Sequence, residues 1–96
     1  MSKIVNDQVR AVEMGMLYVT PGVILEIKSV EVFAALDRHA SCDWGLICDQ
    51  DREANEEALI HGFRIMSVYQ DSKNTKFWII TEADRSVTTV LLPEEY

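Results

Sequence analysis

The spacing of apolar residues changes close to residue 64. Before that point apolar positions recur every three or four residues, which is the period of an amphipathic helix. From Arg64 onward they alternate with polar positions, which is the period of a strand in a half-buried sheet. The chain therefore divides into a helical front and a sheet-forming back.

The back of the chain predicts a three-stranded antiparallel meander. Its strands are RIMSVYQ, KFWIIT and SVTTVLL, which are rich in β-branched and aromatic residues. The turn-forming stretches DSKNT and EADR separate them, and Pro93 ends the last strand because it has no amide to donate. The expected unit is a meander at the C-terminus.

One helix is predicted over about residues 30–40. Ser29 is the expected N-cap, and Glu31, Asp37 and Arg38 are expected to face solvent. The apolar stripe that would face the core consists of Val32, Phe33, Leu36 and Ala40.

A second helix is predicted over about residues 50–61. Asp49 is its expected N-cap, His61 lies near the negative end of its dipole, and Gly62 terminates it. The side chains expected to face the core are Ala54, Ala58 and Leu59.

The first 27 residues allow more than one interpretation. Apolar residues at Val5, Val9, Val12 and Met16 have helical spacing, but residues 16–20 (MLYVT) equally suit a fourth strand. Thr20 followed by Pro21 is typical of an N-cap and first helical position, so a short helix is expected through VILEI.

Together these elements predict an α+β fold. Two or three short helices would pack on one face of a three- or four-stranded antiparallel sheet. Ninety-six residues leave little room for a second core, so residues 1–96 are expected to form one domain. A composition of 48% hydrophobic and 26% charged residues is typical of a globular protein.

The net charge of −7 arises largely in one segment. Residues 43–57 contain a single basic residue, Arg52, among six acids. Such a segment repels a phosphate backbone, so direct nucleic-acid binding is disfavoured and a basic protein partner is favoured. The six acids are Asp43, Asp49, Asp51, Glu53, Glu56 and Glu57.

Membrane insertion and export are not expected. No apolar run approaches the roughly 18 residues that a membrane-spanning helix needs, and the start MSKIVNDQVR lacks the apolar region of a signal peptide. A cytoplasmic location follows, in which Cys42 and Cys48 would stay reduced.

No metal, cofactor or catalytic residue is predicted. The possible soft ligands have the spacing H-x2-C-x5-C-x12-H, which departs from zinc-site patterns and suits apolar thiols and helix-end imidazoles. Glycine-rich phosphate loops, the nucleophile motif G-x-S-x-G and the zinc motif H-E-x-x-H are all missing. The four possible ligands are His39, Cys42, Cys48 and His61.

Two further clusters mix charge with turn positions. Asp43-Trp44 follows the first predicted helix, and Asp84-Arg85 lies between the last two strands. Trp44 would either bind a partner or close the core, and Asp84 with Arg85 would either bind or form a solvated hairpin tip. Arg64 and Arg85 would also suit an anion site on the sheet, with Thr81, Thr88 and Thr89 as hydroxyl partners.

Three long segments carry a resemblance to a known family. LDRHASCDWG, DREANEEALIHGFRIMSVY and FWIITEADRSVTTVLLPEEY resemble a group of small uncharacterised proteins carried on bacterial plasmids and other mobile elements. The likeness spans residues 17–96 and implies no activity or cofactor. Members are sometimes labelled as a restriction–modification methylase subunit, but this chain lacks the length of a methyl-donor domain and an N-P-P-[YF] motif.

Two functional hypotheses follow. The first is a non-enzymatic accessory protein of a mobile element that binds a host-defence or regulatory protein through the acidic helix, chiefly Asp51, Glu53 and Glu57. Homodimerisation is also expected, because a small sheet leaves edges that a second copy can cover.

The alternative hypothesis is a small ribonuclease or toxin. RIMSVYQ and FWIITEADRSVTT resemble the meander of barnase-type domains, in which helices precede an antiparallel sheet. Arg64, Glu82 and Arg85 would act on the sheet, with His39 or His61 supplied from a helix end.

Overall fold

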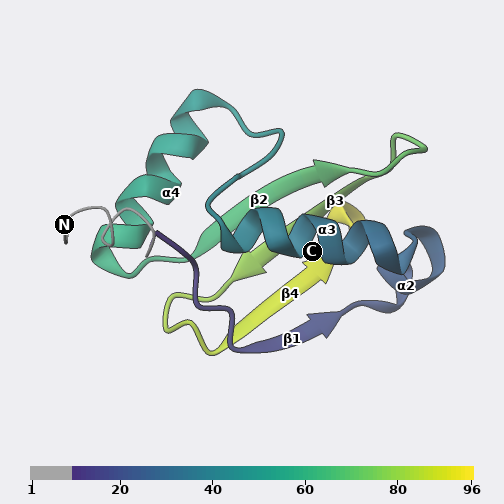
Figure 1. Cartoon of the computed structure of the whole chain (residues 1–96), viewed down its shortest axis with the longest axis horizontal. Coiled ribbons are helices and arrows are strands. Elements are labelled where there is room, and N and C mark those ends of the chain that lie inside the picture. Colours follow the sequence, from purple (N-terminus) through teal and green to yellow (C-terminus); the bar gives the residue numbers. More distant parts are fainter. Residues whose placement is uncertain (1–9) are drawn as a thin grey trace, which may run out of the picture.

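The computed structural model describes residues 10–96 and has the predicted α+β fold (Figure 1). α3 lies across one face of the sheet, α4 stands at one end of it, and α2 lies near the opposite end (Figure 1). The elements in chain order are β1 (Met16–Val19), α2 (Pro21–Glu26), α3 (Ser29–Ala40), α4 (Asp49–His61), β2 (Ile65–Gln70), β3 (Lys76–Thr81), β4 (Val87–Leu91) and the 3-10 turn η1 (Pro93–Glu95).

The four strands form one sheet in the order β1-β4-β3-β2. β2, β3 and β4 form the predicted antiparallel meander. Residues 16–19 form the fourth strand, but β1 runs parallel to β4, with Met16 opposite Val87. The parallel pairing arises because β1 reaches the sheet from the opposite end of the chain, and three helices, rather than a hairpin, connect it to the meander.

The two faces of the sheet differ in burial. Successive side chains of a strand point to opposite faces. In β2 the residues of one face, Ile65, Ser67 and Tyr69, are fully buried, whereas Met66 and Val68 of the other face are half-buried. The buried face is therefore the one on which the helices pack.

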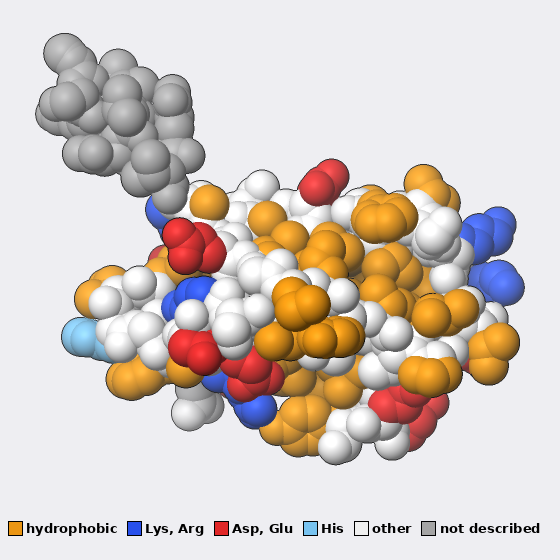
Figure 2. All heavy atoms as spheres, turned by 90° about the horizontal axis from the view of Figure 1, so that it is seen from below, with side chains coloured by type: hydrophobic (Ala, Val, Ile, Leu, Met, Phe, Trp, Pro, Cys, Tyr) orange, Lys and Arg blue, Asp and Glu red, His pale blue; other side chains and the backbone are white. Residues whose placement is uncertain are grey.

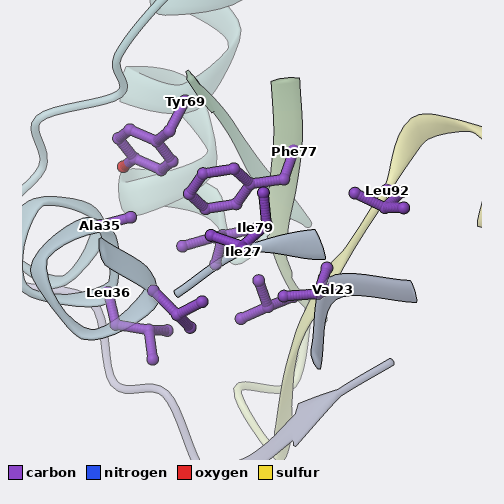
Figure 3. Close-up of a cluster of buried hydrophobic side chains, with 10 residues drawn as sticks. Val23, Ile27, Ala35, Leu36, Tyr69, Phe77, Ile79 and Leu92 are labelled. Carbon is purple, nitrogen blue, oxygen red and sulfur yellow. The ribbon is translucent and has the colours of Figure 1, made fainter. Parts of the chain in front are cut away.

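The main core lies between α2, α3 and this face of the sheet. Tyr69 and Phe77 lie side by side there, with ring centres 6.0 Å apart, opposite Ala35 and Leu36 (Figure 3). Burying such apolar surface is the principal favourable contribution to folding. The cluster comprises Val23, Ile27, Val32, Ala35, Leu36, Tyr69, Phe77, Ile79, Val90 and Leu92.

α2 begins as its sequence predicts. The Thr20 hydroxyl accepts a hydrogen bond from the Val23 amide, and Pro21 occupies the first turn. Glu95 strengthens this helix start from the other end of the chain, since its carboxylate accepts from the Thr20 hydroxyl at 2.5 Å and the Gly22 amide at 2.9 Å. The C-terminus therefore holds α2 in place.

α3 differs from its prediction in cap and in buried face. Its N-cap is Lys28 rather than Ser29, without a side-chain hydrogen bond. Phe33 is 62% exposed, because the buried stripe passes through Val32, Ala35 and His39 instead. The prediction placed the Phe33 ring in the core and left out His39, whose imidazole is buried because the sheet supplies its hydrogen-bonding partners.

α4 ends as predicted and begins one residue earlier than expected. Gly62 adopts a left-handed conformation, with φ 77°, and its amide donates to the Ala58 carbonyl. The N-cap is Cys48 rather than Asp49, and Ala54 is exposed.

The core position in the middle of α4 belongs to a polar residue, Asn55. Its amide donates to the Met66 carbonyl at 2.9 Å, and its carbonyl accepts from the Met66 amide at 3.3 Å. These two bonds attach α4 to β2.

No helix forms over residues 10–15, so the predicted N-terminal helix is wrong there, while Val5 and Val9 lie outside the described residues. Gly15 explains the break: its φ is 62°, and a Cβ at this position would lie 2.2 Å from the Ser86 carbonyl oxygen. The Met16 amide then donates to the same oxygen at 2.9 Å, which starts the pairing of β1 with β4.

Candidate functional site

Asp43 and Trp44 lie in the segment between α3 and α4, and their side chains are bonded to these two helices. The Asp43 carboxylate accepts two hydrogen bonds from the Arg38 guanidinium, at 2.7 and 3.1 Å, and these bonds hold its pKa below the usual range. Trp44 is 2% exposed, and its indole N–H donates to Glu56 at 3.1 Å. Of the two predicted roles of Trp44, the structure shows the packing role.

Arg85 is held by backbone carbonyls on two sides. Its guanidinium donates to the carbonyls of Ala58 and Phe63, at 3.0 and 2.7 Å, at the end of α4. It also donates to the carbonyls of Glu82 and Ala83 in its own hairpin, at 3.2 Å each. Arg85 thus joins the β3–β4 hairpin to α4, and these contacts use the donors that an anion site would need.

Asp84 organises the tip of the same hairpin. Its carboxylate accepts from the Ser86 hydroxyl at 2.6 Å and from the Ser86 amide at 3.0 Å, which lowers its pKa. Arg85 beside it has a φ of 63°, in the left-handed region. The structure therefore shows Asp84 as a turn residue on an exposed hairpin.

Arg64 has partners of its own. Its guanidinium donates to the Tyr96 hydroxyl at 2.6 Å and lies 5.5 Å from the centre of that ring. The Tyr96 ring in turn packs edge-on against Trp78, with ring centres 5.5 Å apart. Arg64 therefore fixes the C-terminus against the sheet.

The acids of α4 lie mostly on the surface. Asp51, Glu53 and Glu57 are exposed. Glu57 lies 3.3 Å from the His61 imidazole. Arg52, the basic residue in the segment, is 3.9 Å from Asp49. α4 therefore presents a negatively charged surface with few cations close to it.

A chain of hydrogen bonds lies beneath α3. His39 is fully buried, with Nδ1 2.6 Å from the Ser67 hydroxyl and Nε2 2.9 Å from the Thr81 hydroxyl. Thr81 lies 2.6 Å from the Thr88 hydroxyl, which donates to the Met14 carbonyl at 2.7 Å. These residues join α3 to three strands.

The Met14 carbonyl at the end of this chain determines which atom donates in each bond as far as His39 Nε2. Because Thr88 donates to the carbonyl, it must accept from Thr81, and Thr81 must then accept from His39 Nε2. Burial together with the nearby Arg85 charge lowers the pKa of His39 to about 4, so the ring is neutral near pH 7. The neutral ring with its proton on Nε2 then accepts from the Ser67 hydroxyl at Nδ1.

The positions of the two threonines bear on the predicted anion site. Thr81 and Thr88 are both fully buried and bonded to each other, so their hydroxyls do not face solvent. Arg64 and Arg85 each have separate structural partners. The hydrogen-bond chain of His39 could not be predicted, because its residues are widely separated in the sequence. The alternation that predicts the strands indicates only which face of the sheet each residue lies on.

The possible metal ligands are not brought together. His39 is buried in the hydrogen-bond chain, whereas Cys48 and His61 are exposed at opposite ends of α4. Cys42 is half-buried, which raises the pKa of its thiol. Within residues 10–96, no group of three or more His, Cys, Asp or Glu side chains is placed to hold a metal ion.

Large apolar side chains are exposed in several elements. On β1, Met16, Leu17 and Tyr18 are 63%, 47% and 51% exposed. A groove of about 450 Å³ lies next to this strand, lined by α2, the start of α3 and Val19. Exposed apolar surface of this extent is typical of interaction sites. The other exposed apolar residues are Ile24, Leu25, Val30, Phe33, Leu46, Ile60, Phe63 and Tyr96.

Comparison of the chain with protein-family models, with curated proteins and with solved structures finds no match. Across residues 10–96, no helix combines the length and apolar character that crossing a membrane requires. The function is therefore inferred from the geometry above.

Proposed function

We propose that this protein is a non-enzymatic accessory protein that acts by binding another protein through the outer face of α4. The observation that carries the proposal is the combination of acids and apolar side chains at this helix. Glu53, Glu57 and Ile60 follow the spacing i, i+4, i+7, so they share one face. Ile60 is 75% exposed, and Phe63, just beyond the helix, is 56% exposed.

This surface fits a basic segment that also carries apolar residues. Charge complementarity guides association and selects the partner, while the buried apolar contacts supply most of the affinity. The net charge of −7 adds to the attraction. The resemblance to proteins of plasmids and mobile elements supports a host-defence or regulatory protein as that partner.

The surroundings of the other polar residues favour binding over ribonuclease chemistry. A general acid or base must reach the substrate, yet His39 is fully buried. Arg85 is bound to backbone carbonyls, and Arg64 is bound to the Tyr96 hydroxyl. His39, Arg64 and Arg85 are therefore engaged in contacts that stabilise the fold, which disfavours a catalytic role for them.

A charge-reversal experiment tests the proposal. Proteins captured from a bacterial lysate are purified, and the affinity of each is measured for the native chain and for D51K/E53K/E57K. The control is E13K/E26K/D37K, which makes the same change in net charge at exposed acids outside α4. We expect the α4 variant to lose at least tenfold in affinity and the control to keep most of it.

Salt provides a second measurement. Affinity of the native chain should fall as salt rises, because salt screens exposed charges. The proposed surface is contradicted by a partner that binds D51K/E53K/E57K as tightly as the native chain. It is also contradicted by a partner whose affinity falls equally for this variant and for the control variant. Cleavage of RNA by the purified protein would contradict the non-enzymatic role itself.

A further inference from the structure

The two edges of the sheet differ in whether another segment pairs with them. Beside β2, residues 44–46 cover the edge: the Leu46 amide donates to the Val68 carbonyl at 2.7 Å, and the Val68 amide donates to the Trp44 carbonyl at 3.2 Å. Beside β1, no segment in residues 10–96 pairs with the outer edge, which runs along the border of the sheet (Figure 1). β1 is therefore the open edge.

The backbone groups on this edge can be assigned. The amides of Met16 and Thr20 donate to the carbonyls of Ser86 and Val90 of the β4 segment, at 2.9 and 3.0 Å. Because successive residues of a strand point their backbone groups to opposite sides, the amides and carbonyls of Leu17 and Val19 point outward. These two residues are the ones that another strand can pair with.

The sequence of β1 lacks the usual protection of an open edge. Natural edge strands carry Lys, Pro or inward-facing charges that prevent pairing with another chain. Residues 14–25 contain no charged residue. Seen from the β1 side, hydrophobic side chains gather across the middle of the molecule (Figure 2). This edge is suited to being covered.

We propose that the β1 edge is covered by β1 of a second copy, in an antiparallel arrangement about a two-fold axis at Tyr18. A copy of this chain carries the same charge of −7, so it can approach closely only where acids are missing. The uncharged stretch 14–25 meets that condition. The two four-stranded sheets then become one continuous sheet.

The register follows from the ends of the strand. Gly15, with φ 62°, is not extended, and Pro21 has no amide, so the ladder cannot continue beyond either residue. Centring the pair on Tyr18 places Leu17 of one copy opposite Val19 of the partner subunit. This register satisfies every outward amide and carbonyl of both residues in both copies; centring it on Leu17 or Val19 does not.

The side chains agree with this register. Tyr18 and Met16 share one face of the sheet, as their 3.8 Å contact shows. There Tyr18 packs against Tyr18 of the partner subunit, and Met16 lies opposite Thr20 of the partner subunit. Leu17 and Val19 lie on the helical face, where Val19 lines the apolar groove. Opposite residues of an antiparallel pair contribute to stability when both are aromatic or β-branched.

The oligomeric state of the full chain tests the inference. We expect the native protein to have twice its chain mass of 11.0 kDa in analytical ultracentrifugation at micromolar concentration. Tyr18→Lys should make it monomeric, because the two ammonium groups would lie opposite each other. The matched control is Leu25→Lys, at an 84% exposed position of α2, which should remain dimeric.

Two further variants test the register. Mixing Tyr18→Lys with Tyr18→Glu should restore a dimer, because each lysine then faces a glutamate. In a chain whose exposed Cys48 is replaced by serine, Tyr18→Cys should form a covalent dimer on mild oxidation, since opposite Cα atoms at such a position lie about 4.5 Å apart. Leu25→Cys in the same background serves as its control and should form much less.

Each contrary result overturns the inference. A native chain that stays monomeric up to millimolar concentration has no such interface. A dimer that persists in Tyr18→Lys is formed by another surface, and failure of the Lys and Glu variants to associate rules out the Tyr18-centred register. None of these results depends on α4, so the inference and the proposed function fail separately.

Discussion

The imidazole of His39 accepts a hydrogen bond from the Ser67 hydroxyl, 2.6 Å away, although 28 positions separate the two residues in the chain. The bond joins α3 to β2 inside the core, where neither group is exposed to water. Burial keeps the ring neutral near pH 7, and this leaves Nδ1 free to accept the bond. Acidity should therefore act on the fold through this residue.

We expect the protein to lose stability as the pH falls from 7 toward 4. The pKa of His39 is about 4 in the folded chain against 6.5 for an unperturbed histidine, so the unfolded chain binds the proton first. The free energy of unfolding should drop by about 2 kcal/mol between pH 7 and pH 5. Urea unfolding at these two pH values measures the change.

The same experiment has a control in His39→Gln, whose stability should vary less over this range. Nitrogen NMR of the native imidazole provides an independent check, because the neutral Nε2–H tautomer should persist at pH 5. A native ring that is protonated at pH 5, or a free energy of unfolding equal at both pH values, would show that burial does not hold His39 neutral.

Replacing Thr81 by valine should be costly. The change leaves His39 Nε2–H without its acceptor in the core, and an unsatisfied buried donor costs about 1–3 kcal/mol. Thr89→Val is the matched control, since Thr89 lies opposite Ile80 on the other face of the sheet and is half-buried. Chemical unfolding of both variants decides the matter: equal, small losses would mean that the hydroxyl of Thr81 is dispensable.

Replacing Arg85 by lysine should loosen α4. The planar guanidinium of Arg85 donates at once to the carbonyls of Ala58 and Phe63 and to those of its own hairpin. The single ammonium group of a lysine cannot make all of these bonds. We expect a loss of about 1–3 kcal/mol and faster amide hydrogen exchange at the end of α4. Arg52→Lys, at an exposed position in the same helix, should change neither measurement. Unchanged exchange in Arg85→Lys would contradict the anchoring role.

Two glycines with left-handed backbone allow a matched comparison. A Cβ at Gly45 would lie 2.0 Å from the Val68 carbonyl oxygen, whereas one at Gly62 would contact nothing within 4 Å. Gly62→Ala should therefore cost only the conformational strain, about 1 kcal/mol, and Gly45→Ala considerably more. Thermal unfolding measures both. Similar losses would mean that residues 44–46 move away from β2 easily.

The strands were predictable because their signal is local. The alternating residues of β2 and the turn around Asp71 place the meander without reference to the rest of the chain. The Asp71 carboxylate accepts from the amides of Lys73 and Thr75, and Asn74 takes a positive φ of 69°, as turn residues should. Gly62 ended α4 for the same local reason.

Relationships between distant segments could not be read in this way. The direction of β1 depends on which strand lies beside it, and its neighbour is the last strand of the chain. The inward position of His39 depends on three hydroxyl groups that lie on the sheet. A periodicity count includes Phe33 in the apolar stripe and leaves His39 out of it, because it assigns no value to polar partners elsewhere in the sequence.

The pairing of β1 with β4 also constrains how the chain can fold. Met16 lies opposite Val87, and the carboxylate of Glu95 binds the first turn of α2. Nothing that holds β1 in the sheet exists until the final strand has been synthesised. During translation β1 therefore remains an uncharged, unpaired segment. Pairing between strands so far apart in the sequence is slow, and an unpaired strand can associate with other chains in the meantime. Its insertion is expected to be a late step, which can occur only after β4 has been synthesised.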